Sequence, residues 1–76
     1  MSTATKPYVV IIEPTATGFG AYVPDLPGLA AFGATREELL QNLREGIAFH
    51  LEGMQEEGLP IPEPTSEALL MAAYVR

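Results

Sequence analysis

The sequence has no cysteine, which excludes disulfides, thiolate zinc sites and cysteine nucleophiles. His50 is the only histidine, so a histidine-rich metal cluster is excluded too. Basic residues are scarce: 4 Lys and Arg against 10 Asp and Glu give a net charge of -6. This balance disfavours direct binding to nucleic-acid phosphates and is compatible with a basic protein partner.

Long apolar runs are also missing. No stretch reaches the ~18 residues that a membrane helix needs, and residues 1–7 lack the apolar segment of a secretory signal. We therefore expect a cytoplasmic protein. The 8.2 kDa chain leaves room for one domain over residues 1–76, with residues 1–6 as a flexible N-terminus. With 47% hydrophobic residues it is too apolar to be disordered. A domain this small buries only ~60% of its unfolded surface and is marginal alone.

Three short strands come first. Residues 8–13, 19–23 and 29–33 are β-branched, aromatic or apolar and are separated by Pro- and Gly-containing turns, which predicts an antiparallel meander. In the first turn we expect Gly18 to be free to take a positive φ. The first strand is apolar on both faces, since Val9 and Ile11 point away from their neighbours. Such a strand is either central and covered on both faces, or covered on one face while the other contacts a partner, and the small size of the domain gives weight to the second alternative.

A long helix follows the strands. Thr35 and Glu38 fit a capping box, in which the Thr35 hydroxyl accepts from the Glu38 amide and the Glu38 carboxylate accepts from the Thr35 amide. Gly58 and Pro60 end the helix, which should span about 23 residues or ~34 Å. One side carries an apolar stripe: Leu39, Leu40, Leu43, Ile47, His50, Leu51 and Met54.

Beyond the helix, residues 58–64 alternate proline with other residues and should be extended. The last twelve residues are ambiguous. Local propensity favours a helix over residues 68–73, while residues 72–75 could instead form a closing strand.

Two other features of the helix suggest contacts with partners. Gly46 and Gly53 each cost about 1 kcal/mol relative to Ala, which the domain's own sheet or a subunit interface could offset by close approach. On another side of the helix Glu38, Glu45, Glu52 and Glu56 share one face, with Phe49 beside them. An apolar anchor rimmed by charge suits a protein interface, although a solvated face explains the glutamates equally well.

Catalytic candidates are weaker. Glu13 and Asp25 could hold Mg²⁺ if they converged, but a strand-end charge and a turn-forming Asp explain them more simply. His50 lies in the apolar stripe and is better explained as a packed imidazole than as a general base.

The order of these elements, with Pro24-Asp25-Leu26-Pro27-Gly28, the Thr35-Arg36-Glu37-Glu38 cap and the proline-spaced segment 58–64, resembles the HicB family of antitoxins from HicA–HicB toxin–antitoxin pairs. The resemblance covers most of residues 7–75. It implies a β-β-β-α-β domain, an α+β fold similar to a partial ribonuclease H fold, with its final strand near residues 70–75. It also implies dimers or larger assemblies, and a small basic HicA-like toxin, an mRNA interferase whose active site the antitoxin masks.

The chain departs from the family pattern at three places. Leu29 stands where many relatives have cysteine, Ala34 where an acidic residue is common, and we expect no DNA-binding domain of the kind that full-length relatives carry. We therefore expect a non-enzymatic antitoxin domain without a cofactor, which forms a homodimer through Val9, Ile11, Gly46 and Gly53. Glu45, Phe49, Glu52 and Glu56 would contact the toxin. The alternatives are a metal-dependent nuclease that uses Glu13 and Asp25, or a self-assembling structural protein.

Overall fold

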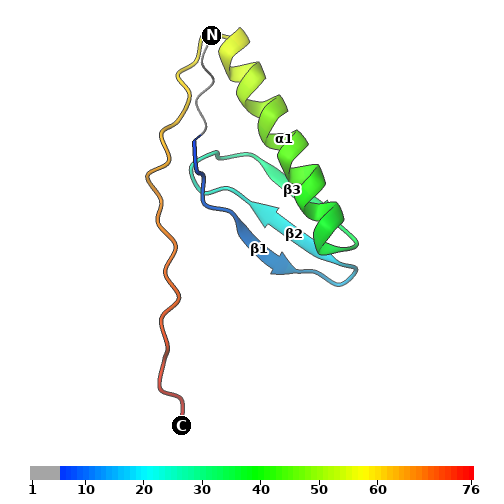
Figure 1. Cartoon of the computed structure of the whole chain (residues 1–76), viewed down its shortest axis with the longest axis vertical. Helices are drawn as coiled ribbons and strands as arrows, with labels where there is room; N and C mark the ends of the chain where they lie inside the picture. The colour runs from blue at the N-terminus through cyan, green and yellow to red at the C-terminus, as the bar shows by residue number, and fades with distance from the viewer. Residues whose placement is uncertain (1–5) are drawn as a thin grey trace.

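A computed structural model describes residues 6–76; residues 1–5, most of the predicted flexible N-terminus, lie outside this range. The described part contains three strands and one helix in the predicted order (Figure 1). Their bounds are Ile11–Pro14 for β1, Phe19–Tyr22 for β2, Ala30–Gly33 for β3 and Arg36–Glu56 for α1.

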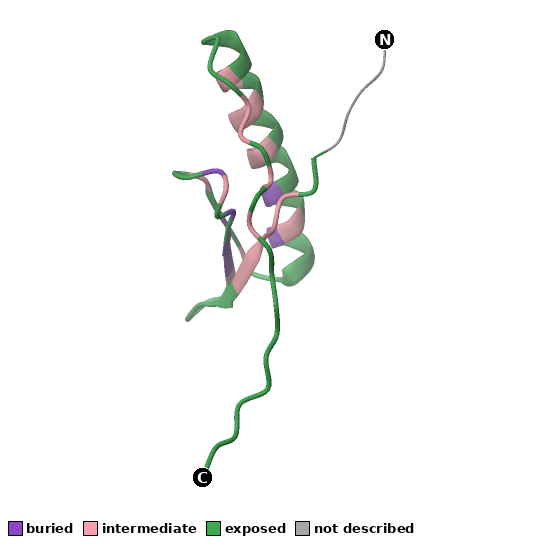
Figure 2. Ribbon diagram, turned by 90° about the vertical axis from the view of Figure 1, so that its left-hand side faces the viewer, coloured by how far each residue is buried: buried purple, intermediate pink, exposed green. Residues whose placement is uncertain are grey.

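The strands form an antiparallel meander in the order β1-β2-β3, and α1 packs across one face of the sheet, mainly on β3. This confirms the predicted α+β fold through the helix. The core lies between α1, the covered face and the turn after β2 (Figure 2). Its buried members are Ala21, Val23, Leu26, Ala31, Leu39 and Leu43.

Two glycines let backbone segments approach closely beside the β1–β2 turn. A Cβ on Gly18 would lie 2.2 Å from the carbonyl oxygen of Gly33, and a Cβ on Gly33 would lie 2.4 Å from the Leu39 nitrogen. Gly18 does not have a positive φ, since Gly28 and Gly58 are the positive-φ glycines of the described chain. The prediction for Gly18 was therefore wrong in its reason: close contact, not φ, requires glycine there.

The helix begins and ends much as predicted. The Glu38 amide donates to the Thr35 hydroxyl at 3.1 Å, but the Glu38 carboxylate accepts from the Ala34 amide at 3.4 Å rather than from Thr35. At the other end Gly58, with φ of 73°, turns the chain. The Gly58 and Leu59 amides donate to the carbonyls of Gln55 and Met54. This is the Schellman arrangement, and it satisfies terminal carbonyls without a basic side chain.

Helix α1 is much longer than the sheet that it covers. Its 21 residues span ~31 Å, whereas each strand of 4 residues spans ~13 Å. The buried helix residues, Leu39 and Leu43, therefore lie in the half nearest the sheet. The C-terminal half of α1 projects beyond the strands (Figure 1).

The ends of the chain differ from the prediction. Residues 8–10 precede β1 instead of forming its first part. There the Tyr8 hydroxyl donates to the Pro62 carbonyl and Lys6 pairs with Glu63 at 2.8 Å, so this segment runs beside the proline-spaced one. Residues 59–76 form neither the predicted closing strand near 70–75 nor the alternative helix over 68–73. Residues 59–66 run beside the N-terminal segment and the turn after β2, and the backbone beyond them runs away from the sheet (Figure 1).

Candidate partner-binding surfaces

The acidic side of α1 is exposed along its length. Phe49 is 80% exposed, and the glutamates around it are exposed as well: Glu45, Glu52 and Glu56. An aromatic ring this open contributes nothing to the domain's own core. The predicted partner-binding residues therefore share one accessible surface, which we call the acidic face.

The position of these charges on the helix is unfavourable for the domain itself. A helix C-terminus carries about half a negative charge from its aligned peptide dipoles, and acidic side chains there are destabilising. The last turn of α1 has no basic residue, while Glu52 and Glu56 form a like-charge pair at i, i+4, which also repels. The C-terminal end of α1 thus concentrates negative potential that no basic side chain in the last turn of α1 offsets, and a basic partner would neutralise it.

An apolar groove runs beside Phe49. It has a volume of about 510 Å³ and lies between the C-terminal half of α1 and two residues from loops, Leu29 and Leu59. The helix residues that line it are Gly46, Phe49, His50, Gly53 and Met54, and Glu57 follows directly after the helix. Phe49 therefore borders both the acidic face and the groove. His50 is half-buried in this wall.

The two helix glycines differ in what they face. A Cβ on Gly46 would lie 3.4 Å from the end of the Leu29 side chain, which is ordinary van der Waals contact, so the domain's own loop lies close but does not require glycine and the interface role of Gly46 stays a prediction. A Cβ on Gly53 would meet nothing within 4 Å. The domain therefore leaves the helix cost of Gly53 without compensation, and its role in an oligomer interface stays a prediction.

The sheet face away from α1 is a second apolar surface. The register places Ile11 opposite Tyr22, and Gly20 opposite Phe32, on this face. Phe32 is 66% exposed. The alternation of strand residues could have revealed this face, but the sequence analysis applied it to the first strand alone. Val9 is half-buried just before β1, and its predicted interface role stays a prediction.

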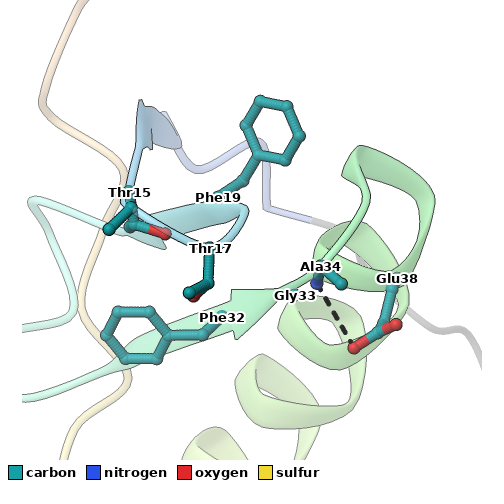
Figure 3. Close-up of a pocket in the computed structure, with 8 residues that line it drawn as sticks. Thr15, Thr17, Phe19, Phe32, Gly33, Ala34 and Glu38 are labelled. Carbon is teal, nitrogen blue, oxygen red and sulfur yellow. Dashed lines mark hydrogen bonds between the residues drawn. The ribbon is translucent and has the colours of Figure 1, made fainter.

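A hollow lined by both apolar and polar residues lies at the hairpin end of the sheet (Figure 3). Thr15, Thr17 and Phe32 line one part of it, and Glu38 lies at its other end. The Glu38 carboxylate is already engaged by the Ala34 amide. The chemistry of this hollow is therefore that of a helix cap.

Asp25 anchors the C-terminal segment. Its carboxylate accepts from the amide and hydroxyl of both Thr65 and Ser66, at 2.9–3.1 Å. These hydrogen bonds hold the pKa of Asp25 below its usual value of 3.8, and the bond from the Ser66 amide has the largest effect. Asp25 thus has a structural role that the sequence analysis did not find.

The two carboxylates of the nuclease alternative do not lie together. Glu13 is opposite Gly20 near the hairpin end of β2, whereas Asp25 lies beyond the other end of that strand. Among residues 6–76, no three His, Asp or Glu side chains gather in a way that could hold a metal ion.

Comparison with known proteins decides the family. Residues 8–74 match the family described as the HicB-like antitoxin of bacterial toxin–antitoxin systems. The chain belongs to this HicB-like family. One chain of a solved HicA3–HicB3 toxin–antitoxin complex is similar to it, with 35% identity and a TM-score of 0.69 over 79% of this chain and 70% of that one.

Curated relatives show the same domain in different hosts. An uncharacterized 14.9 kDa protein of Haemophilus phage HP1 is 39% identical over 88% of this chain and 52% of its own length. A UPF0150 protein of Thermoplasma acidophilum is 33% identical over 87% of this chain and 97% of its own length. The chain thus spans about half of the phage relative and nearly all of the archaeal one. None of the helices described in residues 6–76 has the length and apolarity to cross a membrane.

Proposed function

We propose that this HicB-like domain acts as an antitoxin by covering a small basic HicA-like toxin with the acidic face of α1. The observation that carries the proposal is the cluster of glutamates around an exposed Phe49 at the overhanging, destabilised end of the helix. Membership of the HicB-like family supports the kind of partner.

Each part of the surface has a separate task. The glutamates steer a basic partner to the surface, and such steering raises association rates by about 10–10³. Phe49 and the groove beside it offer an apolar anchor site at the border of the acidic face, and buried aromatic anchors carry much of the binding energy in protein interfaces. Together they would block access to the toxin's basic surface without any catalytic step.

We further propose that the domain is non-enzymatic, cytoplasmic and a homodimer. The separation of Glu13 from Asp25 and the engagement of Asp25 by Thr65 and Ser66 support the first of these. The open sheet face with Ile11, and the uncompensated Gly53, supply apolar or small-residue surface for a second copy. The partial ribonuclease H-like character of the fold also remains a proposal.

The test uses a HicA-like toxin encoded beside the chain's own gene. Glu45→Lys with Glu52→Lys should slow association by about tenfold or more at low salt, and the difference should shrink as salt rises. Phe49→Ser should speed dissociation. Protection of mRNA from the toxin should fall in parallel.

The matched control is Glu13→Lys with Glu37→Lys, which makes the same change in net charge at exposed positions away from the acidic face. If the control slowed association as much as the acidic-face variant, overall charge would explain the effect. Binding that was insensitive to both pairs and to Phe49→Ser would refute this surface.

A further inference from the structure

The C-terminal tail, residues 67–76, is an apolar segment that the domain leaves uncovered. Every residue of the tail is exposed, Leu70 completely and Tyr74 by 94%. Its large apolar side chains are Leu69, Leu70, Met71, Tyr74 and Val75. A soluble domain rarely leaves such a contiguous set in water without a partner for it.

The tail has the pattern of a strand covered on both faces. In an extended chain Leu69, Met71 and Val75 point to one side, while Leu70 and Tyr74 point to the other. Both sets are apolar, as in strands that lie between two covering layers. Among the described tail residues the side-chain charges, Glu67 and Arg76, cancel, although the chain as a whole carries -6. The tail can therefore approach a second, equally acidic copy with little repulsion.

The sheet offers one free edge for such a strand. At the outer edge of β3, the Phe32 carbonyl already accepts from the Asn42 side chain at 2.7 Å. At the outer edge of β1, no hydrogen bond to another segment is present within residues 6–76. An unpaired edge of this kind is a template for strand addition.

The anchor at Asp25 determines where the tail starts. Hydrogen bonds to Thr65 and Ser66 fix the chain just before the tail, and from there the backbone runs straight away from its own sheet (Figures 1 and 2). A tail held in this direction is positioned to contact a second molecule rather than its own sheet. In a dimer with two-fold symmetry, the tail of each copy would contact the other copy in the same way.

We propose that the tails of two copies exchange, each adding a strand beside β1 of the other copy. This rests on the homodimer of the proposed function and names the segment that forms it. A large buried apolar side chain removes about 60–120 Å² from water. Five such side chains on each of two tails, with the surfaces they cover, bury about 1,200–2,400 Å², which reaches the ~1,200–2,000 Å² of stable interfaces.

Cross-linking between two differently marked chains tests the exchange, because the natural sequence has no cysteine. One chain carries Ala72→Cys or Ala73→Cys in the tail, and the other carries Glu13→Cys on β1. After mixing, a flexible thiol cross-linker should join the two kinds of chain. Gln41→Cys, exposed on α1, replaces Glu13→Cys as the control and should not be joined to the tail.

Sedimentation analysis of the full chain gives the second readout. Leu69→Asp with Met71→Asp should convert the dimer to a monomer. The helical signal in the circular dichroism spectrum should be kept, because the tail lies outside the core. Ala16→Asp with Thr17→Asp adds the same charge at the exposed hairpin turn and should leave the dimer intact.

The outcomes separate this inference from the antitoxin proposal. The exchange is overturned if the chain is monomeric, or if it dimerises without cross-links between the tail and β1. It is also overturned if a chain carrying both Glu13→Cys and Ala72→Cys cross-links only within itself, because the tail would then pair with β1 of its own copy. Toxin binding by such a chain would leave the antitoxin proposal standing. Salt distinguishes the two contacts as well, since the exchange should persist at high salt while toxin association weakens.

Discussion

The placement of acidic residues on α1 predicts that the same charge change has opposite effects at the two ends of the helix. Glu56 lies in the last turn, where the helix dipole is negative, and Glu37 lies in the first turn, where it is positive. Glu56→Gln should therefore raise the free energy of unfolding, and Glu37→Gln should lower it. Both variants change the net charge from -6 by one unit, so general repulsion within the chain is matched.

The magnitude follows from exposed charges near helix ends. Each dipole contact is worth about 0.3–1 kcal/mol, and removing the like-charge pair of Glu56 with Glu52 adds about 0.2–0.5 kcal/mol. Glutamine and glutamate have similar helix propensities, so propensity cancels. The two variants should differ by roughly 1–2 kcal/mol. For a domain of this size, 1 kcal/mol shifts the melting temperature by about 4–8 °C.

Thermal and urea unfolding at low and high salt would measure the difference. It should be largest at low salt and fall as the Debye length shortens. Equal melting temperatures for the two variants at low salt, or a lower one for Glu56→Gln, would refute the claim that this end of the helix sacrifices stability. Glu56→Gln should also weaken toxin association, so a gain in stability should accompany a loss in binding.

Three further predictions concern the fold and the tail. Gly33→Ala should lower the free energy of unfolding by about 1–3 kcal/mol or more, because its Cβ would meet the Leu39 backbone. Gly53→Ala should raise the free energy of unfolding by about 0.8–1 kcal/mol, since nothing lies within 4 Å of its Cβ. Chemical denaturation measures both changes. Leu39→Ala should cost about 2–5 kcal/mol, while Leu69→Ala should not change the unfolding of the monomer at concentrations where no dimer forms. Asp25→Ala should abolish hydrogen-exchange protection of the Thr65 and Ser66 amides. Because the folded pKa of Asp25 lies below 3.8, its anchoring is complete above pH ~4 and is lost as the pH falls through the folded value, so acid should mimic Asp25→Ala.

Local patterns in the sequence predicted the first four elements because each pattern coincides with a contact made nearby. The Thr35 cap, the Gly58 terminus and the apolar stripe from Leu39 onward all act within one helix. Strand alternation likewise identified the meander. The predicted acidic face followed from helix geometry alone, and its four residues are indeed exposed on one helix.

What the sequence could not predict depends on segments that are distant in the chain. Asp25 was interpreted as a turn residue, because nothing in its neighbourhood indicates that Thr65 and Ser66, 40 and 41 residues away, donate to it. The tail was ambiguous for the same reason: its helix and strand propensities are balanced, so its structure depends on what covers it. Gly18 was correctly identified as special, but the reason lay in the approach of Gly33 from another strand.

The overhang of α1 divides one continuous helix into two parts of unequal protection. The half that carries Leu39 and Leu43 opens only when the core opens, so its amides should exchange with solvent at a rate set by global unfolding. The other half is attached through half-buried residues such as Ile47 and Leu51, and its turns can fray while the sheet remains folded. Binding of a partner to this half would order its turns. The free energy of the new contacts would then have to offset the conformational entropy that the helix loses. The proposed binding surface and the less protected half of α1 therefore overlap.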